Sequence, residues 1–178
     1  VAREAGINRK VVESYFNILE DLLIATRIPV FQKRAKRRLI KHPKFYYFDV
    51  GVYRTIRPKG PLDSPQEIEG AALETLVLQE LTAWISYNRL DFKIYFWRTS
   101  NGKEVDFVCY GENGFTAIEI KRKDKFYRKD LKGLKAFKSD YPAAKCILLY
   151  AGNKRFYHNE YEVIPIEQMI KTPEDFLT

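Results

Sequence analysis

The fold is decided by residues 104–121, which read EVDFVCYGENGFTAIEIK. Apolar and polar residues alternate along both halves of this stretch, and a period of two is typical of β-strands. The Asn113-Gly114 pair between the halves is a strong signal for a tight turn. The stretch therefore predicts an antiparallel hairpin, with Val105 and Phe107 on one face of the first strand and Asp106 on the other.

The register of this hairpin suggests a candidate site. Closing the turn puts Asp106 opposite Glu119 and Glu104 opposite Lys121. Directly paired residues have Cβ atoms about 4.5–5.5 Å apart, so the two carboxylates repel unless a cation lies between them. Mg²⁺ fits this position because it takes oxygen ligands. The alternative is a ladder of salt bridges between Glu104, Glu119 and Lys121 on a solvated face.

The elements around the hairpin predict a mixed α/β domain with the order αβββαβ. Ser64, Pro65 and Glu67 form a capping box that starts a helix running to about residue 86. We expect three antiparallel strands to follow, then a Lys-rich amphipathic helix, a buried apolar strand, a short hairpin and a last helix. Apart from the short hairpin, these elements are predicted at residues 93–98, 104–110, 115–121, 128–140, 145–150 and 167–171.

Glu74 is the unusual residue of the first of these helices. It lies within an apolar stripe that includes Val77, Leu78 and Leu81 at helical spacing. A carboxylate in such a stripe carries a desolvation cost unless it is paired or bound to a metal ion. Glu74 is therefore a fourth candidate site residue, beside Asp106, Glu119 and Lys121.

The N-terminal residues 1–23 predict a helix-turn-helix, with a turn at Gly6 and Asn8 as the N-cap of a longer helix. In this motif the first residues of the second helix contact DNA, here Arg9 and Lys10. A plain helical hairpin that packs on a neighbouring domain is the alternative interpretation.

Two strand-like runs, residues 27–31 and 44–48, flank a basic tract, and together they predict the wing of a winged helix. Such an arm contacts phosphates without reading the base sequence. Its predicted DNA-binding residues are Lys33, Arg34, Lys36, Arg37, Arg38 and Lys41. We expect one domain over residues 1–57, a winged helix-turn-helix segment with its basic arm, and a second domain over residues 64–178.

The charge distribution points to a polyanionic partner. The net charge of +8 comes from two clusters, because residues 33–44 hold seven basic and no acidic side chains and residues 121–138 hold nine basic and two acidic ones. The rest of the chain is net acidic. Localised basic patches favour nucleic acid, although a Lys-rich helix is also compatible with a simple solvated face.

Composition excludes several classes of protein. A chain of 178 residues that is 46% hydrophobic can bury a core, so wholesale disorder is excluded. We see no run long enough to span a membrane, no zinc-site pattern and only two cysteines, which fits a reducing, cytoplasmic location. The chain begins inside a predicted helix, so we expect it to be a fragment of a longer protein.

The motif Glu74, Asp106 and Glu119-Ile-Lys121 resembles that of the PD-(D/E)XK nuclease superfamily, which includes restriction enzymes and archaeal Holliday-junction resolvases and has an αβββαβ core. The resemblance implies that Asp106 and Glu119 bind Mg²⁺ or Mn²⁺, that Lys121 assists catalysis and that Glu74 is the acid supplied by the helix, also toward the metal.

Most of the chain also resembles the C-terminal region of a family of prokaryotic AAA-type ATPases, a winged helix followed by a nuclease-like domain of unknown function. The supporting stretches are residues 47–51 (YFDVG), 70–77 (GAALETLV) and 96–107 (FWRTSNGKEVDF). This resemblance implies an ATPase domain as an N-terminal partner. No P-loop motif occurs in the chain, so ATP would act only through that other domain.

Three functions are compatible with these features. The first is a DNA-binding, Mg²⁺-dependent endonuclease module that hydrolyses phosphodiester bonds. The second is a catalytically inactive nuclease-fold module that binds DNA or protein and regulates the attached ATPase. The third is a purely structural interaction domain. We expect DNA and the ATPase domain as partners, no membrane, and the possibility of a homo-oligomer.

Overall fold

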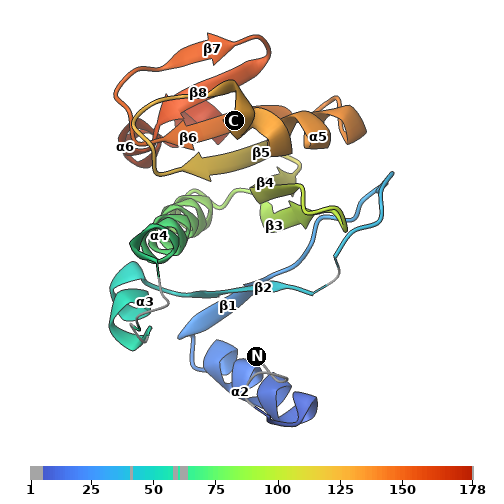
Figure 1. Cartoon of the computed structure of the whole chain (residues 1–178), viewed down its shortest axis with the longest axis vertical. Coiled ribbons are helices and arrows are strands. Elements are labelled where there is room, and N and C mark those ends of the chain that lie inside the picture. The colour runs from blue at the N-terminus through green and yellow to red at the C-terminus, as the bar shows by residue number, and fades with distance from the viewer. Residues whose placement is uncertain (1–5, 41, 58–59, 61–63, 178) are drawn as a thin grey trace.

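The structure is a computed structural model that describes residues 6–40, 42–57, 60 and 64–177. An N-terminal helix and hairpin precede a six-stranded mixed sheet with helices, as Figure 1 shows. The mixed α/β class predicted from the sequence is therefore confirmed. In chain order the elements are α2 (Arg9–Asp21), β1 (Ala25–Ile28), β2 (Lys44–Tyr47), α3 (Val50–Ile56), α4 (Pro65–Tyr87), β3 (Lys93–Arg98), β4 (Glu104–Gly111), β5 (Gly114–Lys121), the 3₁₀ turn η1 (Arg128–Leu131), α5 (Lys132–Asp140), β6 (Lys145–Tyr150), β7 (Phe156–His158), β8 (Tyr161–Pro165), α6 (Ile166–Lys171) and α7 (Glu174–Leu177).

The six-stranded sheet has the order β3-β4-β5-β6-β8-β7. Strands β3, β4 and β5 are antiparallel neighbours, as the turn signals predict. Strands β5 and β6 are parallel and are joined through α5, since parallel neighbours need a long crossover. Strand β8 is parallel to β6, and β7 closes the far edge as an antiparallel partner of β8.

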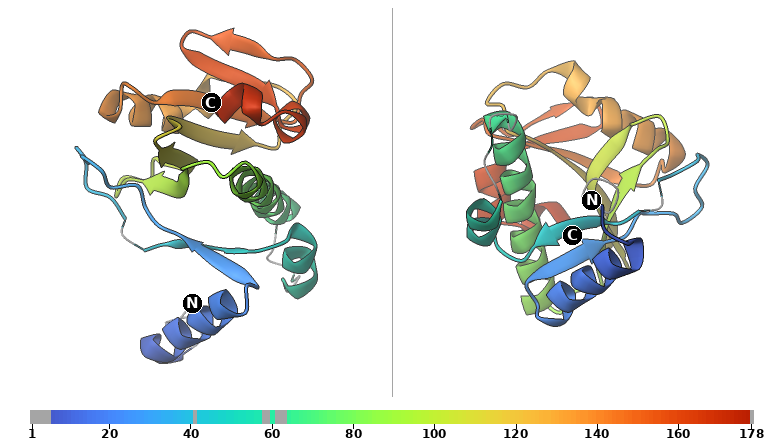
Figure 2. Two further views of the ribbon diagram at one scale, coloured as in Figure 1. Left: turned by 180° about the vertical axis from the view of Figure 1, so that it is seen from behind. Right: turned by 60° about the horizontal axis from the view of Figure 1, so that its bottom comes forward.

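Two hydrophobic cores lie on opposite faces of this sheet, and α4 and α5 cover them from opposite sides (Figures 1 and 2). Side chains alternate between the two cores along each buried strand. Ile147 and Leu149 of β6 belong to the α4 side, whereas Cys146 and Leu148 belong to the α5 side. Burial on both faces explains why this strand reads as a continuous apolar run.

The predicted register of the β4–β5 hairpin is confirmed, because Tyr110 pairs with Phe115 and Phe107 pairs with Ile118. The ladder ends at this second pair. Beyond it, the Asp106 side chain takes the place of a main-chain partner, because its Oδ2 accepts a hydrogen bond from the Ile120 N–H at 2.8 Å. Asp106 therefore contacts the backbone of the opposite strand instead of forming a regular pair with Glu119.

The predicted faces of β4 are wrong at Val105, and a β-bulge is the reason. Tyr95 of β3 pairs with Val108 while Trp97 pairs with Val105, so β4 holds one more residue than β3 in this interval. The extra residue puts Val105 into the core on the α5 side, whereas Phe107 packs on the α4 side. Bulges bend a strand and re-aim its side chains, here around Asp106.

The helix boundaries follow capping signals. Ser64 is the N-cap of α4 and accepts from the Glu67 N–H at 3.1 Å, with Pro65 in the first turn, as predicted. Helix α3 was not expected from the sequence. Its N-cap is Asp49, whose side chain accepts from the Val52 N–H at 2.9 Å, so this residue starts a helix as well as following a strand.

In the N-terminal segment, one predicted helix and the predicted hairpin are confirmed. Asn8 caps α2 by accepting from the Lys10 N–H at 2.9 Å. The preceding helix of the predicted helix-turn-helix falls on residues 1–5, outside the described part of the chain. One apolar stripe of α2 packs on the hairpin, with the rings of Phe16 and Phe45 4.7 Å apart, and a second stripe with Val11 and Tyr15 is exposed.

The arm between β1 and β2 is attached to the large sheet. Val30 and Leu39 form bridges to Phe96 and Thr99, so the arm lies along β3, at one edge of the sheet. Phe31 is 1% exposed and inserts into the core on the α5 side. The N-terminal segment and the sheet thus share packed surfaces, and the division into two domains at residues 58–63 stays a prediction.

No helix among the described residues has both the length and the apolar character that a membrane span needs.

Candidate functional site

The candidate site lies where β4 begins and β5 ends. The bulge in β4 and the end of the β4–β5 ladder leave Asp106 and Glu119 beyond the last regular pair. Both side chains are buried, each residue being 7% exposed. Asp106 contacts the N–H of Ile120, the residue that follows Glu119, and after burial the repulsion from Glu119 is the next cause of the raised pKa of Asp106.

Glu119 has one satisfied and one unsatisfied carboxylate oxygen. Its Oε1 accepts from the Lys121 ammonium at 2.5 Å. Its Oε2 is buried and has no hydrogen-bond partner among the residues that the structure describes. Gly133, in the first turn of α5, packs against this oxygen and against the main-chain oxygen of Glu104. An unpartnered buried carboxylate oxygen is costly, and it points to a missing donor or cation.

Glu74 reaches the same cluster from α4. Its Oε2 accepts a hydrogen bond from the Tyr46 hydroxyl at 2.8 Å and lies 3.5 Å from the Lys44 ammonium. Glu74 also raises the pKa of both Asp106 and Glu119 by charge repulsion. The structure therefore brings together all four residues predicted from the sequence, namely Glu74, Asp106, Glu119 and Lys121.

Lys44 is the most important residue that sequence reasoning missed. Its Nζ forms an ion pair with Glu104 and lies 3.5 Å from Glu74 and 3.9 Å from Asp106. It therefore lies among three carboxylates, although it belongs to the basic tract. Lys44 and Tyr46 both point to this cluster because residues two apart share one face of a strand. The sequence shows this spacing, but it does not show which part of the molecule that face of the strand contacts.

Glu104 was expected to face Lys121, and this expectation is wrong. Glu104 instead pairs with Lys44 and lies 3.5 Å from Arg98 of the neighbouring strand, whereas Lys121 pairs with Glu119. The bulge and the insertion of Lys44 separate the two expected partners. The acidic cluster thus consists of Glu74, Glu104, Asp106 and Glu119.

The acidic side chains of this cluster outnumber its basic ones. Within the described part of the chain, four carboxylates face two ammonium groups, with Arg98 at the exposed edge. Burial, followed by repulsion from Glu119 and Glu74, raises the pKa of Asp106 well above its usual value. Burial raises the pKa of Glu119 to about 7, even though Lys121 opposes the shift. Burial alone would lower the pKa of Lys44, but Glu74, Asp106 and Glu104 together raise it.

The donor chemistry fits a hard divalent cation. In the described residues, no three His, Cys, Asp or Glu side chains already stand as a metal-binding group, and the Lys44 ammonium lies among the acids instead. Mg²⁺ is nevertheless commonly bound by one or two carboxylates together with water and substrate phosphates. The unpartnered oxygen of Glu119 and the nearby carboxylate of Asp106 meet that requirement.

The predicted DNA-binding residues fall into two groups. Three already have partners within the molecule: Arg9 pairs with Glu13, the Lys33 ammonium lies 4.2 Å from the centre of the Tyr110 ring, and Arg37 pairs with the buried Asp140 of α5. Lys10, Arg34, Lys36 and Arg38 are exposed, and Lys41 lies outside the described residues.

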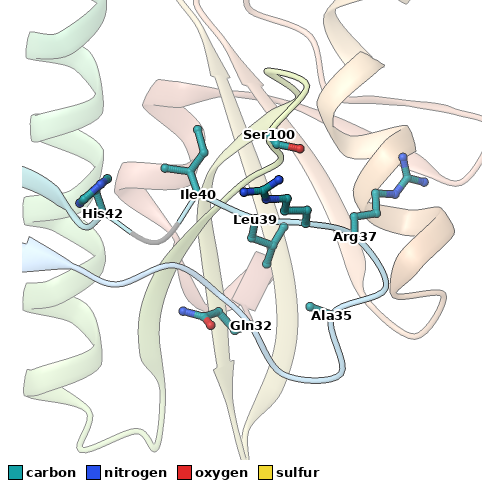
Figure 3. A pocket seen from close by; sticks show the side chains of 8 residues that line it. Gln32, Ala35, Arg37, Leu39, Ile40, His42 and Ser100 are labelled. Atoms are coloured by element: carbon teal, nitrogen blue, oxygen red, sulfur yellow. The ribbon is translucent and has the colours of Figure 1, made fainter.

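The arm borders an open pocket of about 870 Å³ (Figure 3). Gln32, Arg38, Ile40 and His42 line it together with Ser100 of the β3–β4 turn. Arg37 lines it as well, and Figure 3 shows its side chain extending towards α5, which agrees with its contact to Asp140. Backbone hydrogen bonds fix the position of the arm, since the Ser100 N–H donates to the Arg38 carbonyl at 3.0 Å.

Two families match the chain, and both are described as domains of unknown function. DUF4143 matches residues 69–169, more than half of the chain, and DUF8612 matches residues 1–63. The four acids and Lys121 lie in the first match, whereas Lys44 and Tyr46 lie in the second. No curated protein matches the chain.

Proposed function

We propose that this chain, which belongs to the DUF4143 family, is a DNA-binding module whose acidic site hydrolyses phosphodiester bonds with a bound Mg²⁺ ion. The observation that carries the proposal is the unpartnered Oε2 of buried Glu119, in a cluster where acids outnumber lysines. A buried excess of carboxylates needs either protons or a cation. Mg²⁺ supplies that charge with oxygen ligands.

Each residue of the site has a role in this proposal. Asp106 and Glu119 would hold the ion, which when bound supplies Lewis-acid stabilisation and a more acidic water. Lys121, fixed by its contact with Glu119, would stabilise the negative charge that develops on the phosphoryl oxygens. Glu74, oriented by the Tyr46 hydroxyl, would position a water molecule. Hydrolysis adds that water across one P–O bond and leaves a phosphomonoester and an alcohol.

The proposed path of the DNA follows the basic arm. The arm returns towards β2 beside Arg98, because the Ile40 N–H donates to the Arg98 carbonyl at 3.0 Å. The side chain of Arg98 in turn reaches Glu104 of the acidic cluster. The exposed basic residues and the acidic site thus lie near one another along one edge of the sheet. This arrangement favours a DNA backbone that crosses the arm and the acidic site.

The test is nicking of supercoiled plasmid DNA with Mg²⁺ or Mn²⁺. We expect Asp106→Asn to abolish it, with a loss of at least about a hundredfold, because the variant keeps the shape of the side chain and removes its charge. Glu112→Gln is the matched control, since it alters an exposed acid at the turn of the same hairpin. Wild-type protein that cuts no form of DNA with either metal would contradict the proposal.

A second candidate function is a catalytically inactive module that binds DNA or protein and regulates an attached ATPase. The observation that favours it is the Lys44 ammonium among the carboxylates, because an internal cation can replace a metal ion permanently. This candidate predicts DNA binding that is sensitive to salt and unchanged by Asp106→Asn, with no bound metal. Titration with Mn²⁺ separates the two candidates.

A further inference from the structure

The acidic site is completed by a residue from outside the DUF4143 match. Lys44 is the first residue of β2 and pairs with Ile28 at the end of the small hairpin. Its side chain crosses to the large sheet, where its Nζ contacts Glu104 and lies within 4 Å of Glu74 and Asp106. The N-terminal hairpin therefore supplies a cation to a carboxylate cluster of α4 and β4.

The Lys44 ammonium lies beside carboxylates that a divalent cation would also bind. Asp106 is a proposed ligand of the divalent cation and is also a neighbour of Lys44. Its Oδ1 lies near the Lys44 ammonium, while its Oδ2 accepts from the Ile120 N–H. A second cation close to the same carboxylates meets repulsion from the ammonium, and this repulsion is strong in a partly buried site. The unpartnered Oε2 of Glu119 shows that Lys44 does not satisfy the whole cluster.

We infer that Lys44 is an internal counter-ion that a divalent cation must displace from the acidic cluster, so that the N-terminal hairpin sets the metal affinity of the site. This inference rests on the proposed function for the identity of the ligand as a divalent cation. Lys44 acts on the site through charge and needs no contact with the reacting atoms. Displaced from the cluster, its ammonium becomes free to meet a phosphate of the nucleic acid beside the arm.

The experiment measures Mn²⁺ binding by calorimetry, without DNA. We expect Lys44→Met to bind one Mn²⁺ at least about tenfold more tightly than the wild type, because the competing charge is gone. Lys44→Arg keeps the charge and should bind Mn²⁺ as weakly as the wild type. Lys123→Met is the matched control, since it removes another lysine that lies 3.5 Å from a buried acid, Asp130, and should leave the affinity unchanged.

A second measurement uses the unaltered chain. Lysine labelling followed by mass spectrometry should show Lys44 protected without metal and several-fold more reactive with saturating Mn²⁺, while Lys123 stays constant. Equal Mn²⁺ affinity in the wild type and Lys44→Met, or no binding by either, would overturn the inference, as would unchanged labelling of Lys44. Tighter binding by Lys44→Met without DNA cleavage would support the inference and contradict the proposed hydrolysis.

Discussion

At the scale of single residues, Glu119 dominates the chemistry of the site. Burial raises its pKa to about 7, and Glu104 and Glu74 add to the shift, while Lys121 opposes it. In the unfolded chain a glutamate titrates near 4.3. Between these values the folded protein holds a proton that the unfolded chain has released, so the free energy of unfolding falls as the pH rises through this window.

We therefore predict that the metal-free protein loses stability between about pH 5 and pH 7.5, by on the order of 3 kcal/mol. Glu119→Gln should reduce this dependence, because the amide mimics the protonated acid, while Asp106, whose pKa is also raised, keeps its own contribution. Chemical denaturation at several pH values measures the effect. Glu112→Gln, at the exposed turn, should retain the wild-type slope, and a stability that rises with pH over this window would contradict the assignment.

The residues of the site differ in how far the sequence could reveal them. Asp106, Glu119 and Lys121 follow from alternation and a turn signal, which are local, and Glu74 is visible as an acid within an apolar stripe. Lys44 could not be found in this way, because its role depends on a contact between segments 30 and 60 residues apart in the chain. In the sequence it is one more cation of a basic tract.

At the scale of elements, the close packing of α5 on β4 supports the site. An added Cβ at Gly133 would lie 1.9 Å from the main-chain oxygen of Glu104 and 3.1 Å from Oε2 of Glu119. A main-chain oxygen cannot rotate away, so the start of α5 must shift. Glycine at this position allows the helix to approach the two acids.

We predict that Gly133→Ala lowers the free energy of unfolding by about 1–3 kcal/mol, the usual cost of overpacking, and weakens Mn²⁺ binding. Gly70→Ala is the matched control in α4, because, outside its own stretch of helix, no atom of the described residues lies within 4 Å of the added Cβ. That change should stabilise the protein by about 0.5–1 kcal/mol through helix propensity. Denaturant titration and calorimetry report the two effects, and equal stabilities of the two variants would refute the packing argument.

Most elements were predictable because their signals are local. The capping box at Ser64 and the period-two pattern of residues 115–121 place α4 and β5 correctly. The bulge at Asp106 was not predictable, since it depends on how β3 pairs with β4. Helix α3 was missed because its seven residues are too few for a clear period, and Asp49 reads equally well as a strand end or an N-cap.

At the scale of the whole molecule, the N-terminal segment packs against the edge and the core of the large sheet. Its arm lies along the edge strand β3, and Phe31 packs among aromatic rings that include Tyr95, Phe115 and Tyr141. Edge strands are commonly protected by such cover. The sequence predicts the arm as a free wing, because nothing local shows where an apolar residue beside a basic run will be buried.

This attachment divides the basic residues of the arm by role. Arg37 forms an ion pair with the buried carboxylate of Asp140, so its removal would destabilise the fold and not report on DNA. Lys36 and Arg38 are exposed, and neither has an ion-pair partner among the residues that the structure describes. These two side chains are therefore the clean test of phosphate binding by the arm.

We predict that the double variant Lys36→Ala, Arg38→Ala weakens DNA binding at about 100–150 mM salt and reduces the slope of log affinity against log salt by about 2, because each lost phosphate contact contributes about 0.9. Fluorescence anisotropy at several salt concentrations measures both quantities. The pair Lys154→Ala, Lys171→Ala removes the same charge from exposed sites near β7 and at the end of α6 and should leave the slope unchanged. If the two double variants lose the same slope, the arm is not the binding surface, and net charge alone accounts for the affinity. A selective loss by the arm variant would instead place phosphates beside Arg98, one ion pair away from the acidic site.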